Sequence, residues 1–482
     1  MTTIDPTSPR LSVGTPLKRQ RRWALESAAP ILAGLLWLRL AGALGPLGFL
    51  IAVVPGCLLL AAGVSLLLYP GDLRIPQFAA IGGVLGFLLS LPMLIILGFG
   101  EGLVLMLLSV ASFLAAGWFS IEQDPCVDDV PPGELNLGLA AQVAVDEAIL
   151  ATIAVRSALV DDPERVLLEV HQARQLFQSR GWLASPESYH VLPPSLTEPR
   201  LAPMRIGNLA FEHLSFASEY EVEADEPGAV RWSSYQANRT AHAWVFRHAD
   251  RPRPWLVCIH GYEMGIARLD VLAFRAAELH HRYGLNLCLP TLPLHGLRRR
   301  GRSSGEGFLA GEFLDTVHAE AQAMWDIRRL LSWIRPQAGG PIGVYGLSLG
   351  GYNASLLASL EGDLACVIAG IPAVDFVRLT WRHGPTTQIR YAERNGLVHD
   401  EVSEIFQVVS PLALRPKVAK SHRYIFAGIA DRLVPADQPR DLWEHWDRPR
   451  IEWYQGAHVT FRAHEQINRF RLDSLRESGL IA

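Results

Sequence analysis

The residue of this sequence most suited to covalent chemistry is Ser348, which lies in the run VYGLSLGG at residues 344–351. An apolar, strand-like run precedes the serine and a helical pattern follows it. A strand that turns sharply into a helix holds its serine on a strained backbone, and glycines two positions before and after avoid collisions in that turn. The N-terminus of the helix adds free N–H groups and a favourable dipole. The pattern predicts Ser348 as a nucleophile.

A serine hydroxyl is a weak nucleophile until a neighbouring base accepts its proton. His458 supplies a candidate base in the run YQGAH at residues 454–458, just after the last apolar run. Asp431 follows the preceding apolar run, in IADRLVP at residues 429–435. Both residues come at the carboxyl ends of strand-like runs, where sites gather in open α/β sheets. We expect Asp431 to fix the tautomer of His458 and to stabilise the imidazolium that forms.

Other residues compete for these roles. Asp375, after the apolar run at 366–371, is an alternative acid, and Asp437 lies further along the loop of Asp431. His422 precedes its strand-like run and is therefore a poor candidate for the base. We keep both acids open as alternatives to Asp431.

The run WLVCIHGY at residues 255–262 ends in a His-Gly pair that predicts a loop beside the nucleophile. Gly261 lets the backbone approach closely. We assign an oxyanion hole to the backbone N–H groups of Tyr262 and Leu349, and one such donor lowers the barrier by about 2.7–4 kcal/mol. His260 is predicted to be a structural residue of this loop.

A basic stretch follows the next apolar run, in TLPLHGLRRRGR at residues 291–302. Runs of like charge are usually solvated, which favours an ordinary basic surface loop. The alternative is contact with an anion, either a lipid headgroup or a substrate phosphate. The arginines concerned are Arg298, Arg299, Arg300 and Arg302.

From about residue 210, short apolar runs alternate with helical patterns. Strands followed by helices predict an α/β fold with a mostly parallel, eight-stranded sheet covered by helices on both faces. The first two runs have no helix between them and predict an antiparallel hairpin at one edge. The strand-like runs are Phe211–Val222, Ala241–His248, Trp255–His260, Leu285–Pro290, Ile342–Ser348, Cys366–Ile371, Tyr424–Ala430 and Ile451–Tyr454, and the longest helical pattern is Glu312–Ile334.

Charged residues are nearly missing between residues 27 and 120, unlike in the remainder of the chain. Crossing a hydrocarbon core of about 30 Å takes about 20 helical residues. Three stretches satisfy this requirement: Leu47–Tyr69, Phe78–Leu97 and the shorter Leu103–Phe119. Ser27–Leu44 is a fourth candidate that carries Arg39, and it is interpreted as either a span or a membrane-surface helix.

The basic residues Lys18, Arg19, Arg21 and Arg22 precede this apolar region. Apolar sequence continues far beyond the length of a cleaved signal peptide, so such a signal is not expected. The positive-inside rule favours a cytoplasmic N-terminus. Four spans would return the chain to the cytoplasm, whereas three would place the large domain outside. We expect four spans, an integral membrane protein and a cytoplasmic catalytic domain.

The net charge of −4 over 482 residues gives no reason to expect a nucleic acid partner. The five cysteines have no CxxC pair and no metal-ligand spacing, so no metal site is predicted. Cys258 and Cys288 lie in apolar runs and are predicted to be buried free thiols. This usage fits a reducing compartment.

These patterns divide the chain into four parts. Residues 1–26 are a basic tail, and 27–120 are a transmembrane helical region. Residues 121–209 are a linker and helical junction that starts in an acidic, proline-rich stretch. Residues 210–482 are the catalytic domain, in which residues 377–421 interrupt the strand pattern and are predicted to form a lid.

Residues 210–482 resemble the α/β-hydrolase superfamily in the GLSLGG, His-Gly and DRLVP motifs described above. This resemblance implies a serine–histidine–aspartate triad without a cofactor, which falls on Ser348, His458 and Asp431. The stretches PLHGLRR at 293–299 and WDIRR at 325–329 are similar to the branch called α/β-hydrolase domain-containing protein 18. The polytopic N-terminal region departs from most members of the superfamily.

The leading functional hypothesis is a membrane-anchored serine esterase or lipase that cleaves acyl esters of small molecules or membrane lipids through an acyl-enzyme on Ser348. A serine peptidase or amidase of the same fold is the first alternative, because both chemistries pass through an acyl-enzyme. A catalytically silent membrane scaffold is the second. Labelling by a fluorophosphonate separates the enzymes from the scaffold.

Overall fold

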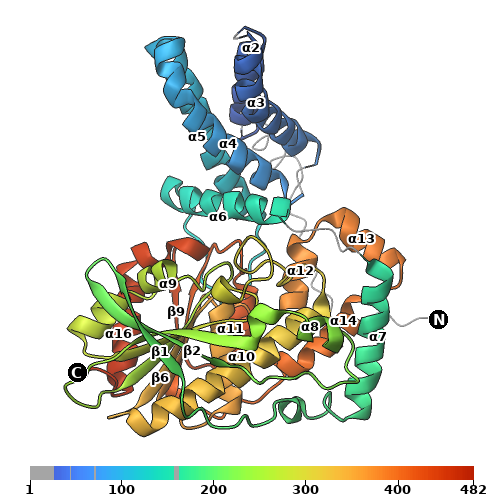
Figure 1. Cartoon of the computed structure of the whole chain (residues 1–482). Helices are drawn as coiled ribbons and strands as arrows, with labels where there is room; N and C mark the ends of the chain where they lie inside the picture. Colours follow the sequence, from blue (N-terminus) through green and yellow to red (C-terminus); the bar gives the residue numbers. More distant parts are fainter. Residues whose placement is uncertain (1–25, 44, 70–71, 157–161) are drawn as a thin grey trace. The chain divides into compact units, whose positions relative to one another are not determined.

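A computed structural model of the chain describes residues 26–43, 45–69, 72–156 and 162–482. The basic cluster at residues 18–22 lies outside the described residues. The chain forms two compact units, shown in Figure 1. The helical unit comprises Met1–Pro125 and Glu134–Thr152, and the sheet unit comprises Cys126–Gly133 and Ile153–Ala482.

The described part of the helical unit contains four helices that are long and apolar enough to cross a membrane. Three of them match the predicted spans, which confirms those stretches as helices of spanning length. The bounds of all the helices in this unit are α2 Ala28–Ala43, α3 Gly45–Leu68, α4 Ile75–Ile96, α5 Phe99–Gln123 and α6 Leu137–Arg156.

The first and last of these helices differ most from the sequence analysis. Helix α2 has 16 residues, which span only about 24 Å at 1.5 Å per residue. Its position as a span or a surface helix therefore stays a prediction. The fourth helix of spanning length is α6, over Leu137–Ala154, which the sequence analysis treated only as a junction helix. Asp146 and Glu147 concealed it, although both side chains are buried and Glu147 accepts the Ser120 hydroxyl at 2.7 Å.

Small residues allow close helix packing in this unit. A Cβ atom added at Gly34 of α2 would lie 2.5 Å from the Leu60 amide of α3, and one at Gly117 of α5 would overlap the Ala140 carbonyl of α6. Without a hydrophobic driving force between helices in lipid, such close backbone approach is the main source of association. Arg39 lies 4.0 Å from Glu101 in the first turn of α5, and both side chains are mostly exposed. The one arginine of α2 thus has an acidic partner.

Among the described residues, the sheet unit is built on a nine-stranded sheet in the order β1-β2-β3-β5-β4-β6-β7-β8-β9. Strands β1, β2, β3 and β5 pair antiparallel, and all the remaining pairs are parallel. The bounds are β1 Arg200–Ile206, β2 Leu209–Ala217, β3 Thr240–Phe246, β4 Trp255–Ile259, β5 Asn286–Thr291, β6 Ile342–Leu347, β7 Cys366–Gly370, β8 Arg423–Gly428 and β9 Arg450–Tyr454.

All eight predicted strands are present, and the fold class is confirmed as an α/β-hydrolase-type sheet preceded by apolar helices. The ninth strand, β1, was missed because it is mostly exposed and contains Pro203. Proline has no N–H for a sheet ladder, but an edge strand has one side free of a partner. Pro203 pairs with Glu212 of β2 on the occupied side.

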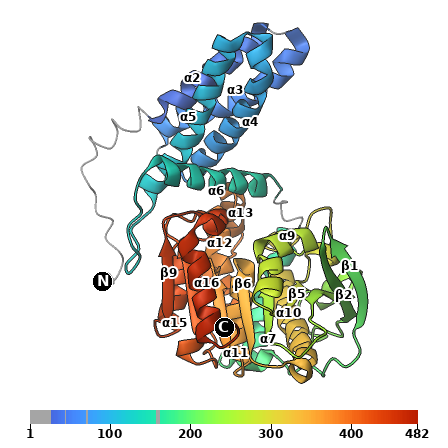
Figure 2. The same ribbon diagram turned by 90° about the vertical axis from the view of Figure 1, so that its left-hand side faces the viewer.

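Helices cover both faces of the sheet (Figures 1 and 2). Alternate strand residues point to opposite faces, so Val257 and Val344 enter one core whereas Leu256 and Tyr345 enter the other. The first core includes residues of α7 Pro163–Ser179, α10 Phe313–Ile334, α11 Leu349–Leu360 and α14 His399–Phe406, and the second includes residues of α16 Glu465–Glu477 and the segment after α9 Ala267–Ala273.

The predicted lid segment is a helical insertion between β7 and β8, with helices α12 Phe376–His383, α13 Thr386–Arg394 and α14. Phe406 is buried and packs against Phe313 and Phe376, while Tyr391 is half exposed. The insertion is therefore anchored in the core at α12 and α14. Its action as a lid stays a prediction.

Candidate active site

Ser348 lies between β6 and α11, at a turn that only a special sequence permits. Its backbone has φ 57° and ψ −114°, a strained conformation for a residue with a side chain. A Cβ atom at Gly346 would overlap the Gly350 carbonyl, and one at Gly350 would overlap the Ile259 carbonyl. The two glycines therefore make the turn sterically possible, as the sequence pattern predicted.

His458 and Asp431 lie beside the serine in a chain of hydrogen bonds. His458 Nδ1 is 2.6 Å from Asp431 Oδ2, and His458 Nε2 is 2.9 Å from Ser348 Oγ. A carboxylate can only accept, so the imidazole proton sits on Nδ1 and Nε2 accepts from the serine hydroxyl. The Val434 N–H donates to the second carboxylate oxygen at 2.7 Å. This geometry allows Ser348 to transfer its proton to His458.

Backbone hydrogen bonds hold the loops of the acid and the base together. The Ile429 N–H donates to Tyr454 O at 3.0 Å, and the Ala430 N–H donates to Gly456 O at 3.1 Å. The side chains of His458 and Asp431 are only 7% and 2% exposed. A buried, prealigned pair loses little freedom when charge develops on the imidazole.

A residue that sequence reasoning missed fixes the acid loop from the other side. His383, at the end of α12, is partly buried and donates from Nε2 to Leu433 O at 3.0 Å. Burial lowers the pKa of His383 to about 3, so the ring is neutral. The sequence around His383 carries no local signal for this role, because the contact joins residues that are 50 positions apart.

The two alternative acids belong to a separate cluster. Arg378 lies 3.4 Å from Asp375 and 2.9 Å from Asp437. Asp375 also caps α12 by accepting the Arg378 N–H at 2.9 Å. Both carboxylates thus have a structural partner, and Asp431 alone of the three bonds to His458 among the contacts described.

The loop after β4 passes close to the nucleophile. A Cβ atom on Gly261 would lie 3.4 Å from Ser348 Cβ, so the backbone leading to Tyr262 runs beside the serine. Leu349 is the first residue of α11 and follows Ser348 directly. These positions are compatible with the predicted oxyanion hole, whose role stays a prediction.

Buried polar groups hold this loop in shape. Its backbone includes Glu263 at φ 61° and Gly265 at φ 83°. The Gly265 N–H donates to the buried Asp270 carboxylate at 3.1 Å, and the Ser304 hydroxyl donates to Met264 O. Desolvation raises the pKa of Asp270 to about 7.

Two further histidines lie beneath the loop. His260 accepts the Leu292 N–H at Nε2, 3.0 Å away, and has Nδ1 2.8 Å from Gly261 O. Burial lowers the pKa of His260 to about 3. It therefore joins two loops as a neutral residue, as the sequence analysis expected. His295 is buried as well and contacts the ring of Tyr262.

The basic loop is not a uniform surface feature. Arg298 is buried, pairs with Asp326 at 2.8 Å, and donates to Thr291 O and Asn238 O at 3.1 and 2.9 Å. Both interpretations of the loop, solvated and anion-binding, are therefore wrong for this arginine. Arg299 and Arg300 remain exposed.

Residues of the WDIRR stretch in α10 also make structural contacts. Trp325 Nε1 donates to Ser218 O at 2.7 Å, Asp326 accepts the Ser218 hydroxyl at 2.6 Å, and Arg329 donates to Ala217 O at 2.8 Å. These bonds fix the end of β2 against the helix. The branch resemblance thus rests on residues that support the fold, and it stays a prediction.

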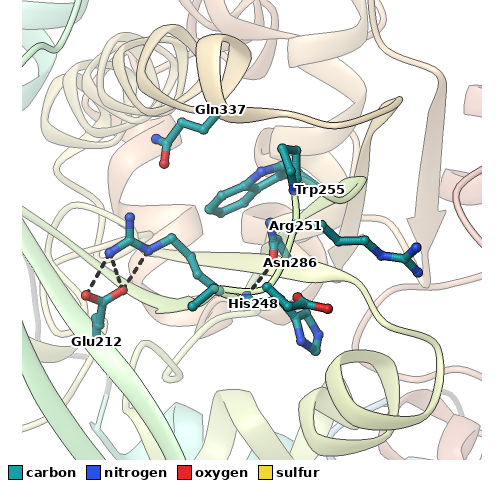
Figure 3. Close-up of a pocket in the computed structure, with 10 residues that line it drawn as sticks. Glu212, His248, Arg251, Trp255, Asn286 and Gln337 are labelled. Carbon is teal, nitrogen blue, oxygen red and sulfur yellow. Dashed lines mark hydrogen bonds and ion pairs between the residues drawn. The ribbon is translucent and has the colours of Figure 1, made fainter.

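A cleft of about 620 Å³ lies at the edge of the sheet opposite to Ser348 (Figure 3). Its lining includes Trp255 and Asn286, the first residues of β4 and β5. Arg247 binds both carboxylate oxygens of Glu212 at 2.7 and 2.8 Å, and Asn286 accepts the His248 N–H at 2.9 Å. Arg247 and Asn286 thus have partners within the cleft, and the cleft holds no nucleophile paired with a base among the contacts described.

The cysteines and potential metal ligands add no second centre in the part of the chain that the structure describes. Cys258 and Cys288 are buried and free, which confirms that prediction. Burial raises the pKa of both thiols, that of Cys288 to about 12. Among the described residues, no group of three or more His, Cys, Asp or Glu side chains is placed to hold a metal ion.

Comparison with curated proteins finds two matches in Mycobacterium tuberculosis, described as uncharacterized protein MT2702 (strain CDC 1551 / Oshkosh) and uncharacterized protein Rv2627c (strain ATCC 25618 / H37Rv). Each is 42% identical over 374 residues, which cover 77% of this chain and 89% of the relative. No protein-family model matches the chain.

Comparison with solved structures finds matches to hydrolases. Acetyl xylan esterase 1 from Thermoanaerobacterium sp. JW/SL YS485 has 15% identity and a TM-score of 0.43, over 61% of this chain and 93% of its own. A dienelactone hydrolase from Klebsiella pneumoniae, described as putative in its source, has 15% identity and a TM-score of 0.35, over 50% and 92%.

Proposed function

The chain belongs to the family of the two M. tuberculosis proteins and has an α/β-hydrolase fold. We propose that it is a membrane-anchored serine hydrolase that cleaves acyl esters. The single observation that carries this proposal is the hydrogen-bonded chain Ser348–His458–Asp431 at the carboxyl edge of the sheet. In this proposal Ser348 is the nucleophile, His458 the base and Asp431 the acid that orients it.

The proposed reaction follows from that geometry. Ser348 Oγ attacks the acyl carbonyl carbon while its proton passes to His458 Nε2. The N–H groups of Tyr262 and Leu349 stabilise the oxyanion. The C–O bond to the alcohol then breaks, and the alcohol leaves with the proton from His458. Water, activated by the same imidazole, releases the acid from the acyl-enzyme and restores Ser348.

The helices of spanning length support an acyl ester that resides in or near a membrane as the substrate, since they would keep the site close to lipid. We propose the division into a tail at 1–26, a membrane region at 27–120, a junction at 121–209 and a catalytic domain at 210–482 with a lid at 377–421. We also propose four spans and a cytoplasmic catalytic domain. The basic cluster at residues 18–22 favours a cytoplasmic N-terminus, and four spans would return the chain to that side.

The test compares purified full-length protein and Ser348→Ala on three substrate sets: p-nitrophenyl esters of rising chain length, phospholipids, and peptide anilides. Serine-dependent turnover of the esters, with a preference that rises with chain length, supports the proposal. Preference for the anilides would instead indicate the amidase alternative. Turnover that persists unchanged in Ser348→Ala, or is absent in a folded sample, contradicts the proposed function.

A further inference from the structure

Helix α9 carries an apolar face that is turned outward instead of into the core. Ile266, Leu269 and Leu272 recur every third residue and are 46%, 45% and 57% exposed. On the other side of the same segment, Asp270 is buried and Phe274 enters the core. A short helix with a carboxylate inside and its large apolar residues outside departs from ordinary surface patterning.

Two neighbouring loops extend this face around the proposed site. Leu297 is 47% exposed in the loop that packs against Gly265, and Val459, 40% exposed, directly follows His458. Helix α9 lies at the same edge of the sheet unit as α12 and α13 in both views (Figures 1 and 2). We call the five residues Ile266, Leu269, Leu272, Leu297 and Val459 the apolar rim. Their loops follow β4, β5 and β9 at the carboxyl edge, which also carries Ser348.

Exposed cations accompany the apolar rim. Arg268 lies within α9, and Arg299 follows Leu297 by two residues; both are exposed. Apolar side chains interspersed with arginine are typical of surfaces that rest in the headgroup region of a bilayer. Anionic lipid headgroups attract such arginines.

The segment that connects α5 to α6 in the sequence is hydrogen-bonded to this edge of the sheet unit. In the segment Cys126–Gly133 of the sheet unit, Pro132 O accepts a hydrogen bond from Gln455 Nε2 at 3.0 Å, three residues before His458. Pro132 comes nine positions after Gln123, the end of α5, and five positions before Leu137, the start of α6. Even the longer connection spans about 30 Å at most when fully extended.

We infer that the apolar rim docks on the surface of a bilayer that contains anionic phospholipid, so that the site opens towards acyl esters within that bilayer. This inference deepens the proposed function and rests on it for the substrate class. A short tether from helices of spanning length, an outward apolar face and exposed arginines at one edge all fit this occupant. Docking on a soluble partner protein would not require a short connection between the apolar rim and helices of spanning length.

The direct test measures depth in the bilayer on the full-length chain. Cys57→Ser/Cys126→Ser removes the two exposed thiols, and a fluorophore is then attached through Leu272→Cys or through Leu192→Cys. Leu192 is 74% exposed and provides the matched control. The proteins are placed in nanodiscs of phosphatidylcholine and phosphatidylglycerol with a doxyl-labelled phosphatidylcholine. Strong quenching at 272 and little at 192 is expected, whereas equal quenching at both, or none at 272, overturns the inference.

A second measurement uses Leu269→Ser/Leu272→Ser, with Val191→Ser/Leu192→Ser as the control pair. The two leucines would be buried in the bilayer when the rim docks. Their loss should therefore lower hydrolysis of a long-chain ester held in the nanodisc by about tenfold. Hydrolysis of dissolved p-nitrophenyl acetate should be unchanged in both double variants. An equal loss on both esters would mean a damaged site and would overturn docking. Because quenching does not depend on turnover, a failed proposed function would appear as an inactive protein whose rim is still quenched.

Discussion

The two edges of the sheet differ in how their polar groups are used. At the amino edge, the cleft of about 620 Å³ is the roomier feature, yet Arg247 is bound by Glu212 and Asn286 by the His248 backbone. At the carboxyl edge, Ser348 is held at φ 57° with its hydroxyl on an imidazole. The strained serine with an imidazole partner lies away from the roomier cleft, which indicates that the size of a cavity alone is a poor guide to chemistry.

The loops at the two edges also differ in the contacts that hold them. Around Ser348, the partly buried His383 and the buried Asp270 hold backbone atoms of neighbouring loops. These contacts keep the reacting atoms in position without touching them. The amino edge has exposed ion pairs, for example Asp250 with Arg253 at 2.6 Å, which contribute little to stability or order.

The largest expected effect is the loss of ester turnover on substitution of Ser348. Ser348→Ala removes the hydroxyl that would form the acyl-enzyme, and ester turnover should fall by about 10⁶-fold, as when the serine of other serine hydrolases is removed. Arg247→Ala at the opposite cleft should leave kcat/KM for p-nitrophenyl esters unchanged. A comparable loss in Arg247→Ala would mean that the cleft takes part in the reaction.

Asp431→Asn sharpens the assignment within the carboxyl edge. An amide at this position no longer selects the tautomer with the proton on Nδ1, and kcat should fall by about 10⁴-fold. Asp437→Asn is the matched control, because Asp437 pairs with Arg378 instead of His458. Steady-state kinetics on one short ester would separate the two, and a larger loss in Asp437→Asn would reverse the choice of acid.

Arg298→Ala tests whether the basic loop is structural. It leaves Asp326 buried without its cation, a change that costs about 3–5 kcal/mol in other proteins. The melting temperature of the sheet unit should fall by several degrees, while Arg299→Ala, whose side chain is exposed, should leave it unchanged. Equal melting temperatures in the two variants would show that the ion pair does not support the loop.

The smallest effect concerns pH. Burial raises the pKa of Asp270 from its usual 3.8 to about 7. Its contribution to stability is therefore complete below about pH 4 and is lost as the pH rises through 7. Wild-type protein should lose more thermal stability between pH 5 and pH 8 than Asp270→Asn, which keeps an acceptor for the Gly265 N–H. Parallel melting curves for the two proteins would contradict this effect.

Much of the fold was predictable because its strands are buried on both faces and stand out as apolar runs. Strand β1 was missed because Pro203 and its exposure remove that signal. Helix α6 was missed as a helix of spanning length because Asp146 and Glu147 interrupt its hydropathy. Both elements were missed for the same reason: the pattern of apolar residues along the sequence does not reveal an edge position in a sheet or a buried polar contact.

For the candidate site, strand ends and motif order were enough to select Ser348, His458 and Asp431, which the structure brings within hydrogen-bonding distance. The supporting contacts were not predictable. The partners of Arg298 come from residues 238, 291 and 326, and only the folded chain places them together. The catalytic roles of Ser348, His458 and Asp431 stay predictions.

The most direct measurement is labelling of full-length protein by a fluorophosphonate, followed by mass spectrometry of the peptides. The account predicts one phosphonylated residue, Ser348, with no adduct in Ser348→Ala and greatly slowed labelling in His458→Ala. Modification at another residue, or unmodified Ser348 in a folded wild-type sample, would contradict the claim that His458 and Asp431 make this hydroxyl reactive.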